Sequence, residues 1–292
     1  MAQETASPYD DNLRVAAWLR QAAELLQAQG ANAFRVGAYR RAADSVERHP
    51  RSVGEIFRDE GRVGLDALPG VGASIAGAIA EMLSTGRWAQ LERLKGEVDP
   101  ARLFRTLPGV GPALATRIHE ALGVETLEGL EAACYDGRLD GVPGVGTRRA
   151  HAIRAALGEL LQRPRRARSD ATSAEPPVAM LLDVDREYRA KSAAGQLPTI
   201  APRRFNPAGT AWLPILHTRR GDWHFTALYS NTARAHDLDR TQDWVVLYFY
   251  SSDEPERQRT VVTEQRGPRA GRRVVRGREE EGQASLPRAI PA

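Results

Sequence analysis

Apolar positions between residues 10 and 163 recur three and four apart, which is the spacing of one face of an α-helix. Segment 11–29 has this pattern and stops at Gly30. Asn32 is expected to cap a second helix, and Ser52 a short third one. The first half of the chain is therefore predicted to be entirely helical.

The pattern changes after about residue 178, where short apolar runs rich in Val, Trp and Tyr are typical of strands. The predicted strands are Val178–Val184, Trp212–Thr218, Trp223–Tyr229, Trp244–Tyr250, Arg259–Thr263 and Arg272–Val275. Arg220-Gly221-Asp222 is expected to form a tight hairpin between two of them. The fold class predicted is α+β in two domains, with an all-α N-terminal array and a small, mainly antiparallel β domain at the C-terminus.

A short segment occurs three times within the helical half. Its copies are Leu68-Pro69-Gly70-Val71-Gly72, Leu107-Pro108-Gly109-Val110-Gly111 and Val142-Pro143-Gly144-Val145-Gly146. Each has a proline before the first glycine, an alanine six residues after it, and a helical apolar pattern downstream. Such repetition indicates one supersecondary unit used three times.

The repeated segment has the chemistry of a phosphate-binding hairpin. Proline presets φ for a turn, and the first glycine supplies the positive φ that a type II turn requires. The second glycine opens a helix whose first N–H groups have no partner within the helix, so they form an anion site. Contacts to phosphate carry no base information, and binding is expected to be independent of sequence.

The candidate DNA contacts follow from the three hairpins. They are Gly70, Gly72 and Ser74 in the first, Gly109, Val110, Gly111 and Arg117 in the second, and Gly144, Val145, Gly146, Thr147, Arg148 and Arg149 in the third. We rank the third hairpin above the second, because it has two arginines at the helix start, and the first last, because no positive charge is near it in sequence. For any single copy the alternative is a purely structural hairpin.

These segments resemble the helix-hairpin-helix motif of DNA repair and replication proteins. Residues 10–155 also resemble the N-terminal region of family X DNA polymerases. The segments that carry this resemblance are Gly37–Ala43, Leu68–Gly72, Leu107–Gly111 and Gly123–Glu128. The family's first domain binds the 5′-phosphate at a DNA gap, and Arg35 and Tyr39 match positions that hold this phosphate. The alternative is that Tyr39 belongs to the core and Arg35 to a solvated face.

The sequence departs from that family at its reactive residues. The lyase reaction of the family needs a lysine amine, but the two matching positions are Ser74 and Ala78, and the only lysines are Lys95 and Lys191. Polymerase chemistry needs metal-binding carboxylates after a Gly-Ser motif. No Gly-Ser precedes Asp183-Val184-Asp185, so these carboxylates are a weak candidate for a metal site.

Composition and charge indicate where the protein works. The net charge is +4, yet residues 1–163 carry 20 basic against 21 acidic residues, so any grip on phosphate there must be local. One cysteine, Cys134, excludes an internal disulfide, and residues 1–11 lack the apolar core of a signal peptide. We expect a cytoplasmic, nucleoid-associated protein with no membrane contact. No cofactor is expected, except that a monovalent cation at a hairpin is possible.

The organisation predicted along the chain has five parts. They are a four-helix domain with the first hairpin (1–95), a tandem of the second and third units (96–162), a linker (163–177), a β-rich domain (178–277) and a disordered tail (278–292). Arginines in the linker and at 266–278 could add non-specific affinity for DNA, or could keep a strand edge soluble.

The β-rich domain carries weaker candidates. His217, His224 and His236 with nearby aspartates could bind zinc, but their spacing matches no closed zinc site. Asn231, Thr232 and Arg234 follow a strand and could line a site, although a polar loop explains them as well.

Three functions are therefore open. The first is a non-catalytic DNA-binding protein of repair or replication, which binds backbone and gap 5′-phosphates. The second is a reduced nucleotidyltransferase or nuclease that uses Asp183. The third is a scaffold whose hairpin helices bind protein partners.

Overall fold

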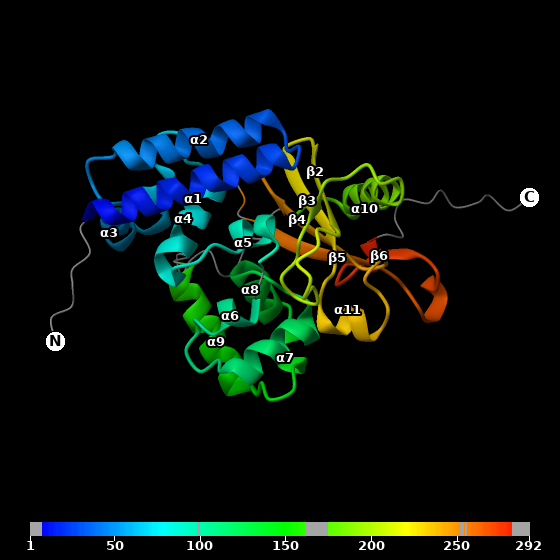
Figure 1. Cartoon of the computed structure of the whole chain (residues 1–292). Helices are drawn as coiled ribbons and strands as arrows, with labels where there is room; N and C mark the ends of the chain where they lie inside the picture. Colours follow the sequence, from blue (N-terminus) through cyan, green and yellow to red (C-terminus); the bar gives the residue numbers. More distant parts are fainter. Residues whose placement is uncertain (1–7, 98–99, 162–174, 252–253, 255, 282–292) are drawn as a thin grey trace, which may run out of the picture.

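The computed structural model describes residues 8–97, 100–161, 175–251, 254 and 256–281, and it confirms the α+β class. The helices of the first half form two groups, and the sheet lies beside both of them (Figure 1). The predicted helix starts are correct, since Asn32 Oδ1 accepts from Phe34 N at 2.8 Å and Ser52 Oγ from Gly54 N at 3.1 Å. In the described residues no helix is both long and apolar enough to cross a bilayer.

In the described residues, ten α-helices and one 3-10 turn precede the strands of the sheet. The first group comprises α1 (Pro8–Ala28), α2 (Ala33–Arg48), α3 (Val53–Asp66), α4 (Ala73–Thr85) and α5 (Ala89–Lys95). The second comprises α6 (Pro100–Phe104), α7 (Pro112–Leu122), α8 (Leu127–Tyr135), the 3-10 turn η1 (Arg138–Gly141) and α9 (Thr147–Leu160). The last is α10 (Val178–Ala193). The backbone leaves the helical conformation at Gly61, with φ +65° and ψ −153°, so the helix that begins after Ser52 is short, as expected, and a second helical piece continues to Asp66.

The sheet is an antiparallel meander whose strands pair in chain order. Its strands are β1 (Thr199–Ile200), β2 (Leu213–Arg220), β3 (Trp223–Tyr229), β4 (Val245–Tyr250), β5 (Arg257–Thr263) and β6 (Arg273–Val275), with α11 (Ala233–Asp237) between β3 and β4. The tight hairpin is confirmed, because Arg220 pairs with Trp223 and Gly221 has φ +56°. A positive φ at the first of two loop residues is the type II′ geometry that suits strand twist.

The predicted strand at Val178–Val184 is wrong, because these residues begin helix α10. Val178, Leu181, Val184 and Tyr188 are buried, and their spacing of three and four is that of a helix face. A short apolar run fits a strand or a buried helix equally well, and only the residues beyond Val184 extend the helical period.

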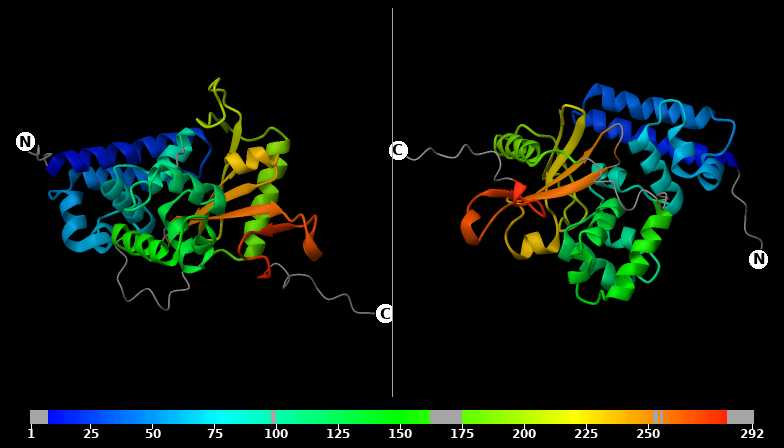
Figure 2. Two further views of the ribbon diagram at one scale, coloured as in Figure 1. Left: turned by 90° about the horizontal axis from the view of Figure 1, so that it is seen from below. Right: turned by 180° about the vertical axis from the view of Figure 1, so that it is seen from behind.

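The two faces of the sheet are buried against different partners. On one face Ile215, Leu228, Val246 and Tyr248 join the hydrophobic core of α1–α5. On the other, alternate residues such as Leu247 pack against α10 (Figure 2). All six residues of β4 are therefore buried, and the first helical group shares one core with the sheet. The second group has a core of its own, built around Phe104, Ile118 and Ile153.

The predicted linker and tail are each structured in part. Glu175 pairs with Arg259 at 2.8 Å and with Arg278 at 3.4 Å, which holds the chain before α10 to the end of the sheet. Residues 278–281 are therefore placed, which corrects the prediction of a disordered tail from 278 onward. Residues 162–174 and 282–292, with the linker arginines, lie outside the described residues.

Buried polar groups join the first helices to the sheet. His217 Nδ1 lies 3.0 Å from Thr226 Oγ1, and Arg35 Nη1 lies 3.3 Å from the same ring nitrogen. His217 Nε2 lies 2.9 Å from Oε1 of Gln29, the residue that follows α1. Burial, helped by the nearby Arg35 charge, holds the pKa of His217 well below its usual value, so the ring is neutral in the folded protein.

We expect stability to depend on pH through His217. When the pH falls from 7.5 to 5.0, the unfolded chain gains a proton on this ring below about pH 6.5, while the folded chain does not. The free energy of unfolding should fall by about 2 kcal/mol from this source. Urea titrations at both pH values should show a smaller loss for His217→Gln than for wild type or for the exposed-site control His151→Gln. Equal losses in all three proteins would refute this assignment.

Candidate nucleic-acid interface

All three hairpins have the predicted type II turn. In each, the carbonyl before the proline accepts a hydrogen bond from the valine three residues on, at 3.0 Å (Leu68–Val71), 3.2 Å (Leu107–Val110) and 2.9 Å (Val142–Val145). The glycine between them has a φ of +75° (Gly70), +77° (Gly109) and +87° (Gly144). A side chain would be strained at these three positions, which explains the repeated glycine.

The valine of each hairpin belongs to the protein interior. Val110 and Val145 are 5% and 6% exposed, and their N–H groups are already used in the turn. Both were predicted to contact DNA, and the structure corrects this, because neither the side chain nor the amide is available to a phosphate. Their burial instead fixes the turn so that the glycines on either side lie at the surface.

The second glycine of each hairpin caps the helix that follows. Gly72, Gly111 and Gly146 precede α4, α7 and α9, and none provides a side-chain hydrogen bond to the helix start. The helices are closed from the first turn onward, with Ala115 N donating to Gly111 O at 2.9 Å and Ala150 N to Gly146 O at 3.0 Å. Among the residues before these positions, Pro112 has no N–H and Arg149 N already donates to Gly146 O at 2.9 Å. The other first-turn amides have no partner within the helix and can bind an anion.

Arginines of two units meet at the third hairpin. A Cβ atom on Gly144 would lie 3.0 Å from Nη2 of Arg117, so this α7 side chain lies against the third turn. Arg149 donates from Nη1 to the Gly144 carbonyl. Thr147 and Arg148 are exposed in the first turn of α9. We group the exposed residues of the second and third hairpins, with Arg117 against the third, under the name hairpin surface: Gly109, Gly111, Arg117, Gly144, Gly146, Thr147, Arg148 and Arg149.

The first hairpin has basic neighbours that its sequence does not reveal. Gly70 lies against Arg41 of α2, whose Cβ would be 3.5 Å from a Cβ on this glycine. Arg62 of α3 donates to Ala73 O at 3.1 Å, beside the start of α4. No positive charge is near this hairpin in sequence, but the fold brings these two arginines beside it. Ser74 is only partly exposed and faces a small pocket with Glu81, as described below.

Arg35 and Tyr39 are buried beneath the sheet, which corrects their assignment to an accessible 5′-phosphate site. Arg35 is 4% exposed, and its Nη1 donates to Thr226 Oγ1 at 3.1 Å. Tyr39 is 2% exposed, and its hydroxyl donates to Gln90 Oε1 at 2.9 Å. A helical group on its own would expose this face, but here β2 to β4 cover it. The sequence alternative that placed Tyr39 in the core is confirmed.

Ser74 and Ala78 line a pocket with three glutamates, Glu81, Glu128 and Glu256. Burial and the nearby Glu128 raise the pKa of Glu81 well above its usual value. These are the positions that match the lyase lysines of the resembled family. An acidic pocket at this place is unsuited to the binding of a phosphate.

Asp183 and Asp185 lie on α10 and not on a strand. Asp185 is 1% exposed and pairs with Arg273 at 2.5 Å, while Asp183 pairs with Arg220 at 2.8 Å. Each carboxylate is thus engaged by arginine. Among the described residues, no group of three or more His, Cys, Asp and Glu side chains is placed to hold a metal ion, and this includes the three histidines considered for zinc.

The comparison with known proteins agrees with this arrangement of hairpins. Residues 10–88 match the family model described as a helix-hairpin-helix domain, and residues 101–159 match the SAM-like helix-hairpin-helix tandem. The helical half carries helix-hairpin-helix domains. The first of these domains holds α1–α4, and the tandem holds α7 to α9 with both hairpins of the hairpin surface.

A curated relative places these domains in context. Over 149 residues the chain is 32% identical to the DNA polymerase/3′-5′ exonuclease PolX of Bacillus subtilis strain 168. The match covers 51% of this chain and 25% of that protein, so the chain spans about a quarter of the length of this relative. The resemblance to the N-terminal region of family X polymerases is therefore confirmed for the helix-hairpin-helix part of the chain.

Proposed function

We propose that this chain is a non-catalytic DNA-binding protein that grips the sugar-phosphate backbone through its hairpin surface. The observation that carries the proposal is the pairing of two helix starts that lack a side-chain cap, α7 and α9, with the exposed arginines Arg117, Arg148 and Arg149. Two such sites on one protein fit two phosphates of a backbone without reading bases.

A role in repair or replication is supported by the polymerase name of the relative. Non-catalytic binding is supported by Ser74 and Ala78 at the lyase positions, and by the engagement of both Asp183 and Asp185 by arginines. The same proposal implies that the protein is cytoplasmic and bound to the chromosome. With Arg35 and Tyr39 buried, we expect no difference in affinity between gapped DNA with and without a 5′-phosphate.

The experiment is a fluorescence anisotropy titration of labelled duplex DNA between 50 and 200 mM salt, roughly the range over which phosphate contacts weaken steeply. Binding should weaken with salt and should be equal for duplexes of unrelated sequence. Salt-independent binding, or no binding to any duplex, would reject the proposal.

One substitution tests Arg148, an exposed arginine in the first turn of α9. Arg148→Ala should weaken binding about fivefold and lower the salt slope by about one, because one phosphate contact is lost. Arg58→Ala, which removes an exposed arginine from α3, is the control and should leave both values unchanged. The same slope for Arg148→Ala and wild type would exclude this arginine from the interface.

A further inference from the structure

The loop between β1 and β2 presents an exposed aromatic residue in an unusual backbone conformation. Phe205 is 50% exposed and has a φ of +53°, one of two non-glycine residues with positive φ among those described. This conformation costs a bulky residue about 1–3 kcal/mol and persists only where the surroundings enforce it. A strained residue that also exposes an aromatic ring needs a reason other than packing.

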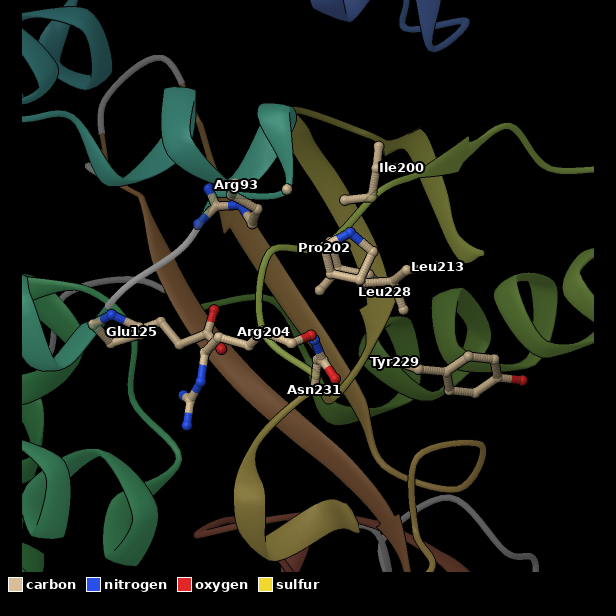
Figure 3. Close-up of a pocket in the computed structure, with 11 residues that line it drawn as sticks. Arg93, Glu125, Ile200, Pro202, Arg204, Leu213, Leu228, Tyr229 and Asn231 are labelled. Atoms are coloured by element: carbon tan, nitrogen blue, oxygen red, sulfur yellow. The ribbon is translucent and has the colours of Figure 1, made fainter. Parts of the chain in front are cut away.

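The loop is fixed on both sides of this residue. Arg203 N donates to Gly96 O at 2.7 Å, and Arg204 O accepts from Asn231 Nδ2 at 3.0 Å. On the other side, Asn206 Nδ2 donates to Thr210 O at 2.8 Å. Figure 3 shows Arg204 and Asn231 reaching the same region from neighbouring elements. The backbone at Phe205 is therefore fixed from both sides.

Two side chains pack against Phe205. The His236 ring of α11 lies 4.3 Å from the phenylalanine ring, with an angle of 38° between their planes. The Arg204 guanidinium lies 5.4 Å from the ring centre. Asn231 joins these parts, because its Oδ1 lies 2.6 Å from His236 Nε2 while its Nδ2 binds the loop. One part of the ring is supported, and the rest faces solvent.

The charge of the loop favours an anionic partner. Residues 202–211 contain two arginines and no acid. Arg203 is exposed and Arg204 partly so. The acidic residues Asp237 and Asp239 lie at the end of α11 and just beyond it, so the basic residues of the cluster are those of the loop. An aromatic ring beside arginines is the usual arrangement for stacking a nucleobase while its phosphates are neutralised.

We propose that Phe205, His236 and Arg204 form a stacking platform for a base of single-stranded nucleic acid. The proposal rests on the DNA-binding function proposed above and adds to it a preference for unpaired bases. The hairpin surface would hold backbone of any kind, whereas the platform accepts only a base that has left its duplex. It assigns a role to the β-rich domain and to Asn231, which positions the platform.

The test uses the full chain and two fluorescein-labelled probes of equal length, an oligo(dT) and a duplex. Phe205→Ala should weaken binding to oligo(dT) about tenfold, which is the loss expected for one base stack, and should change duplex binding less than twofold. Phe34→Ala is the matched control, since Phe34 is 78% exposed on α2 and has an ordinary helical backbone. It should leave both affinities unchanged.

A conservative variant separates stacking from loop structure. Phe205→Trp should keep the wild-type affinity, and its added fluorescence should be quenched by oligo(dT). Unchanged oligo(dT) binding by Phe205→Ala, or equal losses on both probes, would overturn the platform. If wild type binds duplex with the expected salt dependence while Phe205→Ala has no effect, only the platform fails. If wild type binds neither probe, the proposed function fails as well.

Discussion

Gly96→Ala should lower the free energy of unfolding by about 3 kcal/mol, because the added methyl group would meet the backbone of another segment. Gly96 ends α5 with a φ of +77°, and a Cβ there would lie 2.3 Å from the carbonyl oxygen of Ala201. This contact is between two backbones, so no side chain can move aside. The substitution adds a clash between the first helical group and the β1–β2 loop to the ordinary cost of a left-handed alanine. Denaturant titration measures it.

Gly86→Ala provides the matched control. Gly86 ends α4 with a φ of +66°, and a Cβ there would meet nothing within 4 Å. The Gly86→Ala variant carries only the cost of an alanine in the left-handed region, so its free energy of unfolding should fall by about 1 kcal/mol. Equal losses at the two positions would mean that the approach of the loop to α5 is not tight in solution.

The double substitution Gly111→Asp and Gly146→Asp should abolish most DNA binding without loss of stability. Both glycines have φ values near those of ordinary helix caps, −80° and −90°, and a Cβ on either meets nothing within 4 Å. Aspartate is a favourable N-cap, so the helices should be at least as stable as before. Its carboxylate would occupy the two anion sites. The loss of two charge-assisted contacts corresponds to about 100-fold or more in affinity.

The matched control replaces the same two glycines by asparagine. Asparagine caps a helix in the same way and has almost the same size, but it carries no charge. Anisotropy titrations should show the Asp variant at least about tenfold weaker than the Asn variant, with equal melting temperatures. If the two variants bind duplex DNA equally well, the helix starts are not the anion sites.

Local features of the fold could be predicted from the sequence, because the interactions that produce them are local. The caps at Asn32 and Ser52 and the type II turns each depend on a few adjacent residues whose backbone preferences are known. The helix that begins at Val178 is not predicted from the sequence, because residues 178–184 contain six apolar residues around Asp183 and show no decisive period. The resemblance to family X polymerases predicted the hairpin turns correctly. It failed for Arg35 and Tyr39, because in this chain the sheet covers the face on which they lie.

The candidate site was predictable in part, for the same reason. The glycines at the turns, with Arg148 and Arg149, lie at the surface as their positions in the hairpin require. Arg35 and Tyr39 could not be placed, since their burial depends on a sheet more than 150 residues later in the chain. The platform residues Phe205 and His236 are 31 residues apart in sequence. The positive φ of Phe205 and the bridge through Asn231, which the sequence does not reveal, help to bring them together.

The core shared by α1–α5 and the sheet has a consequence for the order in which the protein matures. Ile215, Leu228 and Val246 must leave the ribosome before the apolar side of the first helices is fully covered. The core of α6–α9 uses only residues 89–161, so this middle segment can fold before the sheet has been synthesised. The part of the chain that carries the hairpin surface would thus fold first, and the N-terminal helices would be completed almost last.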